Sequence, residues 1–179
     1  MRLSLIIILS LLVVFLIPAE LSAQEKRKRD KREQKEPVKL NYEEIKKMVH
    51  LGLYIFTAKE IKPVGRSRIS LISNYYEVSV EYYDVYAYLP SFRRYQPYSI
   101  GSNDIEVEGK LDQLFIEEKD SRKIVRVKFR VLDQGAYIFN FTIFENGYTE
   151  LTLTTPRGSL VTYSGKTEPL EPEVDQFHD

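Results

Sequence analysis

Polar and apolar residues alternate most regularly between residues 123 and 132, in the segment KIVRVKFRVL. The apolar set is Val125, Val127, Phe129 and Val131, and the basic set is Arg126, Lys128 and Arg130. Alternation with a period of two residues is typical of a β-strand that has one buried and one solvated face. We therefore expect a strand here whose apolar side chains point into a core.

Further segments downstream of residue 52 are rich in β-branched and aromatic residues and have the length of strands. They are residues 53–61, 67–72, 74–80, 84–90, 104–109, 110–118, 136–144, 148–155 and 159–165. Short sequences such as DQGA, ENGY and TPRG join several of them, and Asn146-Gly147 is a strong hairpin signal. Strands joined by tight hairpins run antiparallel. About eight such strands predict a meander that closes into a barrel or folds into a sandwich.

Residues 41–51 are the one segment with a clear helical pattern. Asn41 and Glu44 have the spacing of a capping box, and Gly52 ends the segment. The apolar positions of one helix face are Tyr42, Ile45, Met48 and Val49. A short helix with one apolar stripe is expected to pack against the sheet.

The first 23 residues predict an export signal. Arg2 precedes an apolar run over residues 3–19 that contains Pro18, and the sequence LSA ends at Ala23 as a cleavage site would. The apolar run is also long enough for a tilted membrane anchor, and the basic flank after it favours the cytoplasmic side of a membrane. An uncleaved anchor therefore stays an alternative. We expect cleavage, export to the periplasm or beyond, no lasting membrane anchor and, without Cys, no lipoprotein modification.

Two charged segments flank the expected domain of residues 41–166. Residues 24–40 contain eight Lys or Arg and four Asp or Glu, whereas residues 167–179 contain five Asp or Glu and no Lys or Arg. Charged segments with few aromatic residues bury too little surface to fold, so we expect a disordered linker and a disordered tail. The basic linker could contact anionic lipid or nucleic acid. Its interleaved acidic residues favour a solvated spacer, and we expect no nucleic-acid partner.

The composition offers few groups for catalysis or metal binding. The chain has no Cys and two His, which are His50 at the end of the helix and His178 in the tail. Disulfides and thiolate catalysis are excluded, and a zinc site is not expected. Since nucleophile motifs and nucleotide-binding glycine patterns are also missing from the sequence, we expect a protein that is not an enzyme and that has no cofactor.

Asp104, Glu106 and Glu108 alternate along one predicted strand and share a face. Such a row could bind calcium or supply an acid and a base. The simpler interpretation is the solvated face of an amphipathic strand, with Ile105 and Val107 inward. The acids could instead pair across the sheet with the basic set of residues 126–130.

Tyrosine is concentrated between residues 75 and 98, where eight of the 13 tyrosines lie. Alternation directs Val85, Ala87 and Leu89 inward and places the intervening tyrosines outward or at the rim. The loop that follows, SFRRYQPYSIGS, is rich in Tyr and Arg, which are enriched at binding hot spots. The candidate ligand- or partner-binding residues are Tyr86, Tyr88, Phe92, Arg94, Tyr95 and Tyr98. Because tyrosine also favours strands, a purely structural role for these residues stays open.

The order of segments, the run YYEVSVEYYDVYAYLPSFRRYQPY and the closing FENGYTELTLTTPRGSLVTYSG resemble domain-of-unknown-function family 4251 (DUF4251). That family consists of exported proteins of Bacteroidetes. The resemblance covers roughly residues 41–168, although Arg93 stands where the family pattern has Gly. It implies an all-β, antiparallel up-and-down barrel of the lipocalin-like type, with one short N-terminal helix, and it implies no activity.

Two functions fit these observations. The first is a non-catalytic barrel that binds a small apolar or amphipathic ligand inside, or at its mouth near residues 92–98. The alternative is an interaction module of the cell envelope, with a filled barrel and an exposed apolar patch. The large side chains of residues 137–144 could fill a small barrel, so the sequence leaves both functions open.

Overall fold

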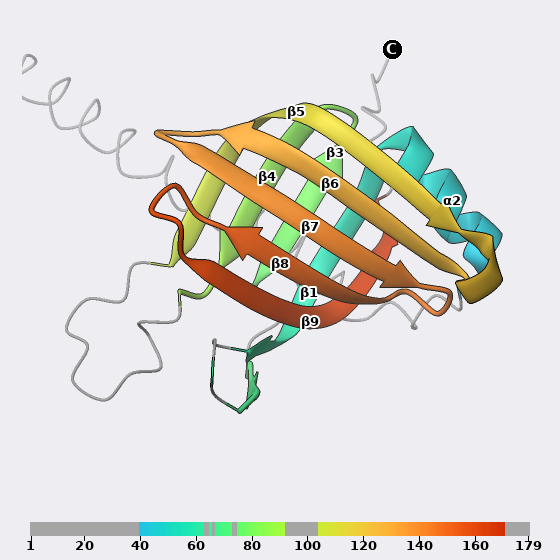
Figure 1. The fold of residues 1–179 in the computed structure, drawn as a ribbon, viewed down its shortest axis with the longest axis horizontal. Coiled ribbons are helices and arrows are strands. Elements are labelled where there is room, and N and C mark those ends of the chain that lie inside the picture. Colours follow the sequence, from blue (N-terminus) through green and yellow to red (C-terminus); the bar gives the residue numbers. More distant parts are fainter. Residues whose placement is uncertain (1–39, 63–64, 66, 73–74, 92–103, 171–179) are drawn as a thin grey trace, which may run out of the picture. The chain divides into compact units, whose positions relative to one another are not determined.

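The computed structural model describes residues 40–62, 65, 67–72, 75–91 and 104–170. These residues form one α-helix, a single-turn helix and nine strands (Figure 1). The helices are α2 (Tyr42–Leu51) and η2 (Asp120–Arg122). The strands are β1 (Leu53–Lys62), β2 (Ile69–Ser70), β3 (Glu77–Glu81), β4 (Asp84–Leu89), β5 (Ile105–Lys119), β6 (Ile124–Leu132), β7 (Ala136–Phe144), β8 (Tyr148–Thr154) and β9 (Leu160–Pro169).

The described strands form one antiparallel sheet that closes on itself. Consecutive strands from β3 to β9 pair in chain order, and β1 pairs with both β3 and β9. Eight strands, β1 and β3 to β9, therefore make a closed up-and-down barrel, as Figure 1 shows. The short β2 is added at the end of β1, where Ile61 lies opposite Ile69. The prediction of an antiparallel barrel is confirmed, and closure removes the exposed sheet edges that an open meander would have.

Helix α2 has the ends that the sequence predicts. The side chain of Asn41 accepts a hydrogen bond from the backbone N–H of Glu44, whose carboxylate accepts one from the N–H of Asn41. Gly52 ends the helix in the left-handed conformation, with φ of 66°. The buried residues Ile45, Met48 and Val49 join the barrel core, so the helix packs its apolar face against the barrel.

Aromatic side chains fill much of the barrel interior. Phe129 stacks on Phe139 and Phe141 at centroid distances of 5.1 and 5.7 Å, and Tyr54 and Phe56 meet Phe141 edge-on. All five side chains are at most 1% exposed. Burial raises the pKa of the Tyr54 phenol, as expected for a dry interior. The predicted inward face of residues 125–131 is confirmed, because Val125, Val127 and Val131 are buried beside these rings.

Three strand predictions need correction. The segments 104–109 and 110–118 form the single strand β5, because Gly109 takes an ordinary extended conformation rather than a turn. A bulge interrupts the pairing of β5 with β6 between Asp112 and Phe115, and Gln113 within it has φ of 54°. The expected strand 67–72 shrinks to the two residues of β2. The last strand continues to Pro169, into the segment expected to be a tail.

Close packing at Gly165 helps to close the barrel. A Cβ atom on this residue would lie 2.0 Å from the carbonyl oxygen of Thr57, so β9 and β1 approach more closely than any residue with a side chain would allow. The pairing of the two strands also shifts register between Ala58 and Glu60. Such bulges bend a strand and increase its twist, as closure of a small barrel requires. In the described part of the chain, no helix has the length and apolar character needed to cross a membrane.

Candidate functional site

The predicted tyrosine site begins at the end of β4. Tyr86 and Tyr88 are half-buried, whereas the predicted inward residues Val85, Ala87 and Leu89 are at most 2% exposed. The ring of Tyr88 stacks on Tyr76 at 5.7 Å, and its hydroxyl donates a hydrogen bond of 2.8 Å to the Asp104 carboxylate. These contacts hold Tyr88 near the end of β4 that lies away from the β3–β4 hairpin, where it also packs against the core.

A hydrogen bond connects the same end of the barrel to β9. The hydroxyl of Tyr163, on β9, donates to the carbonyl oxygen of Pro90 at 2.9 Å, and both residues are buried. The other four predicted site residues, Phe92, Arg94, Tyr95 and Tyr98, lie outside the described residues. The structure therefore leaves the predicted site a proposal.

The acidic row lies on a solvated strand face, since Glu106 and Glu108 are exposed and Val107 is buried, but it does not pair with the basic strand. Glu106 and Glu108 lie opposite Tyr88 and Tyr86 of β4. The partners of Arg126 and Arg130 are instead Glu117, at 3.3 Å, and Asp112. The alternative of pairing with the basic set was wrong because β5 is one long strand, so that only its second half lies beside β6. Among the described residues, no group of three His, Asp or Glu side chains could hold a metal ion.

An apolar patch lies where helix α2, the β3–β4 hairpin and β5 meet. Tyr82 and Tyr83, the hairpin residues, are 54% and 68% exposed. The N–H of Tyr82 bonds the carbonyl of Gly52 at the helix end, and the carbonyl of Tyr83 accepts a bond from Leu111 in β5. Further along the same part of β5, Leu114 and Phe115 are also exposed. We call Leu51, Tyr82, Tyr83, Leu114 and Phe115 the rim patch.

Helix α2 runs beside the second half of β5 and is held there by charged groups (Figure 1). Glu118 contacts His50 at 2.6 Å and Lys46 at 2.9 Å. The hydrogen bonds from His50 and Lys46 lower the pKa of Glu118. Tyr42 donates to Asp120 at 2.9 Å, and desolvation together with this bond raises the pKa of Tyr42 to about 12. His50 thus serves as a structural contact near the helix end.

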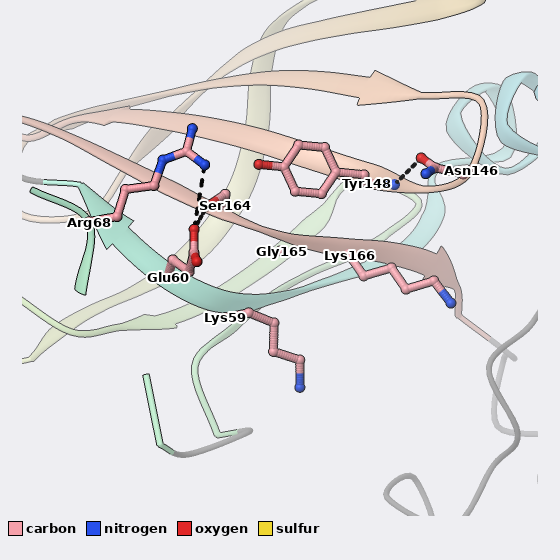
Figure 2. Close-up of a pocket in the computed structure, with 8 residues that line it drawn as sticks. All are labelled: Lys59, Glu60, Arg68, Asn146, Tyr148, Ser164, Gly165 and Lys166. Atoms are coloured by element: carbon pink, nitrogen blue, oxygen red, sulfur yellow. Dashed lines mark hydrogen bonds and ion pairs between the residues drawn. The ribbon is translucent and has the colours of Figure 1, made fainter. Parts of the chain in front are cut away.

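A surface depression of about 520 Å³ lies over the seam where β8, β9 and β1 meet (Figure 2). We call it the seam depression. Its described lining residues are Lys59, Glu60, Arg68, Asn146, Tyr148, Ser164, Gly165 and Lys166. Arg68 lies 3.6 Å from Glu60 and 3.4 Å from Glu150, and Ser164 donates to Glu60 at 3.0 Å. Tyr148 is anchored against Phe144 at a centroid distance of 5.7 Å.

Sequence reasoning did not find the rim patch or the seam depression. Both bring together segments that are far apart in the chain, such as Lys59 with Lys166 and the helix end at Gly52 with Tyr82. Their assembly depends on which strands become neighbours on closure and on the bulges in β1 and β5. Tyr82 and Tyr83 alone carried a local signal, because two tyrosines in a tight hairpin are not needed for core packing.

Comparison with known proteins agrees with the fold. Residues 36–167 match the model of the domain of unknown function DUF4251. A crystal structure of a DUF4251 family protein from Bacteroides eggerthii is similar to the chain with a TM-score of 0.60 and 15% sequence identity. The match covers 72% of this chain and 87% of that protein. No curated protein matches the sequence.

Proposed function

The chain belongs to the DUF4251 family, a domain of unknown function, and we propose that it is a non-catalytic interaction module that binds another protein through the rim patch. The observation that carries the proposal is the exposure of large apolar side chains on three elements that contact one another, namely α2, the β3–β4 hairpin and β5. Tyr83 and Phe115 are 68% and 60% exposed, and Leu51 and Tyr82 are 51% and 54% exposed. Adjoining exposed aromatic residues of this kind mark protein-binding surfaces, where tyrosine is enriched.

The packed interior supports a function on the outer surface. Ligand-carrying barrels keep an internal space, whereas small barrels can be filled by their own side chains. Here the rings of Tyr54, Phe56, Phe129, Phe139 and Phe141 occupy the interior and contact one another. A ligand at the centre would have to displace these rings, which would cost packing free energy at each contact.

Photo-crosslinking in cells tests the proposed interface. A benzoylphenylalanine residue at position 115 replaces an exposed aromatic ring and should capture a protein partner, and the yield should fall when Tyr83→Ser is added. The same photoreactive residue at Arg157, an exposed position in the turn between β8 and β9, is the control. Failure to capture any protein from position 115, or capture that Tyr83→Ser leaves unchanged, contradicts the assignment of the rim patch.

A second candidate function is the binding of a small amphipathic ligand at the tyrosine-rich end. The arrangement of Tyr76, Tyr88 and Asp104 favours it, because it presents stacked rings beside a carboxylate. The residues proposed for contact are Tyr86, Tyr88, Phe92, Arg94, Tyr95 and Tyr98. Native mass spectrometry of protein isolated from cells should then detect an added mass, and Phe92→Ala with Tyr95→Ala should remove it.

We further propose that the protein acts after export, in the periplasm or outside the cell. The support is the apolar N-terminal run with its small-residue cleavage site. The mature protein should then begin at Gln24, which the intact mass of protein from the periplasmic fraction would reveal. A full-length mass in the membrane fraction would instead favour the anchor.

A further inference from the structure

The seam depression has a chemistry that neither the rim patch nor the tyrosine-rich end shares. Among its described lining residues, three are cationic (Lys59, Arg68 and Lys166) and one, Glu60, is acidic. Tyr148 contributes an aromatic ring, which Figure 2 shows between Ser164 and Asn146 with its hydroxyl directed toward the Arg68 side. We propose that the seam depression binds a small anion carried on a flat ring, such as an aryl sulfonate or aryl carboxylate.

The cationic side chains can take an additional anionic partner. Lys166 lies 2.8 Å from Glu168, and both side chains remain about one-third exposed. Exposed pairs of this kind contribute roughly 0–1 kcal/mol, so an incoming anion can share or replace such a partner. Arg68 contacts Glu60 and Glu150 at 3.6 and 3.4 Å, which is longer than the 2.7–2.9 Å of strong charge-assisted hydrogen bonds. Its guanidinium has five N–H donors, more than these two contacts use, so it can also donate to a ligand.

The polar and aromatic groups of the depression are held in place from below. Ser164 is 6% exposed and its hydroxyl is fixed by Glu60 at 3.0 Å. The side chain of Asn146 accepts a hydrogen bond from the N–H of Tyr148, which fixes the start of β8. The Tyr148 ring, 36% exposed, rests on Phe144 and offers its other side to a ligand. Side chains fixed in this way lose little entropy on binding.

Three probes separate the contribution of charge from that of the ring. Naphthalene-2-sulfonate carries both, its neutral sulfonamide carries the ring alone, and inorganic sulfate carries the charge alone. We expect naphthalene-2-sulfonate to cause saturable shifts of the Ser164, Gly165 and Tyr148 amide resonances. Its Kd should be about tenfold lower than that of either other probe, because the sulfonamide lacks the ion pair and sulfate lacks the ring contact. Equal binding of the sulfonamide would overturn the anion assignment, and equal binding of sulfate would overturn the requirement for a ring.

Matched double variants locate the site. Lys59→Met with Lys166→Met should raise the Kd for naphthalene-2-sulfonate about tenfold. Lys110→Met with Lys123→Met removes the same charge from two exposed lysines that pair with Asp84 and Glu145, and it should leave the Kd unchanged. An equal loss in both double variants would show general charge attraction and overturn the site, as would the absence of saturable shifts in the parent protein. Because the rim patch shares no residue with the depression, these results are independent of the proposed protein partner.

Discussion

Tyr163 and Pro90 lie 73 positions apart in the chain and are joined by a buried hydrogen bond of 2.9 Å from the tyrosine hydroxyl to the proline carbonyl oxygen. The bond crosses the end of the barrel and fixes the residue that follows β4, just before the predicted binding loop. A proline carbonyl at this position has no strand partner among the described pairings, so the hydroxyl supplies its bond from the opposite wall.

Tyr163→Phe keeps the ring and removes this bond. We expect the free energy of unfolding to fall by about 1–3 kcal/mol, because the buried carbonyl oxygen loses its partner. Urea denaturation of the two proteins measures the difference. Tyr83→Phe, which removes a hydroxyl from an exposed ring, is the control and should change stability by less than about 0.5 kcal/mol. If both variants behave alike, the bond does not contribute to stability.

The packing of Phe141 makes a second prediction. Its ring contacts Tyr54, Phe56, Phe129 and Phe139, so Phe141→Ala should lower the free energy of unfolding by about 3–5 kcal/mol through lost burial and the cavity left behind. An apolar cavity binds benzene. Benzene should therefore raise the melting temperature of the variant and leave that of the parent unchanged.

The response of the melting temperature to benzene also discriminates between a filled and a hollow barrel. Phe115→Ala removes the same side chain from a 60% exposed position and should have a small effect on stability with no response to benzene. If benzene also stabilised the parent protein, the interior would hold accessible space. That result would favour a barrel that binds a ligand inside over a barrel filled by its own side chains.

The features that could be predicted from the sequence are those set by neighbours in the chain. The helix limits follow from the capping pair Asn41 and Glu44 and from Gly52, and the buried face of β6 follows from strict alternation. The hairpin at Asn146-Gly147 is also confirmed, with Gly147 at φ of 80°. In each case the physical cause acts within a few residues, as capping, side-chain alternation and turn geometry do.

The remaining features depend on long-range pairing. Gly109 and Lys110 resemble a turn in sequence, yet cross-strand bonds to both β4 and β6 keep β5 continuous. Closure of β1 on β9 decides that Lys59 and Lys166 share a surface, and no local pattern encodes that contact. Of the predicted site residues, only Tyr86 and Tyr88 fall in the described part of the chain, so the loop contribution stays a prediction.

The helix cap offers a third test with a conservative control. Asn41→Ala removes the acceptor for the Glu44 N–H and should lower the free energy of unfolding by about 0.5–2 kcal/mol. Asn41→Asp keeps an oxygen acceptor and adds a favourable charge at the helix N-terminus, so its stability should match that of the parent. Thermal unfolding compares the three proteins. Equal losses for Ala and Asp would show that the contact of Asn41 with Glu44 depends on the amide group rather than on capping.

The pairing of Glu118 with His50 and Lys46 makes the attachment of helix α2 sensitive to acid. The folded-state pKa of Glu118 lies below its ordinary value of 4.5, mainly because His50 and Lys46 donate to the carboxylate. A lowered pKa means that the folded state holds the proton less tightly than the unfolded state. The stabilisation is therefore present above pH 4.5 and is lost as the pH falls through the folded-state pKa.

Glu118→Gln removes this titration. We expect the variant to be less stable than the parent at pH 6 and the difference to shrink as the pH is lowered below 4.5, because the parent then loses the same charge. Urea denaturation across this range gives the difference at each pH. Glu145→Gln, which removes an exposed carboxylate paired with Lys123 at 3.0 Å, provides the matched control. A difference between Glu118→Gln and the parent that does not change with pH would mean that the glutamate acts by shape rather than by charge.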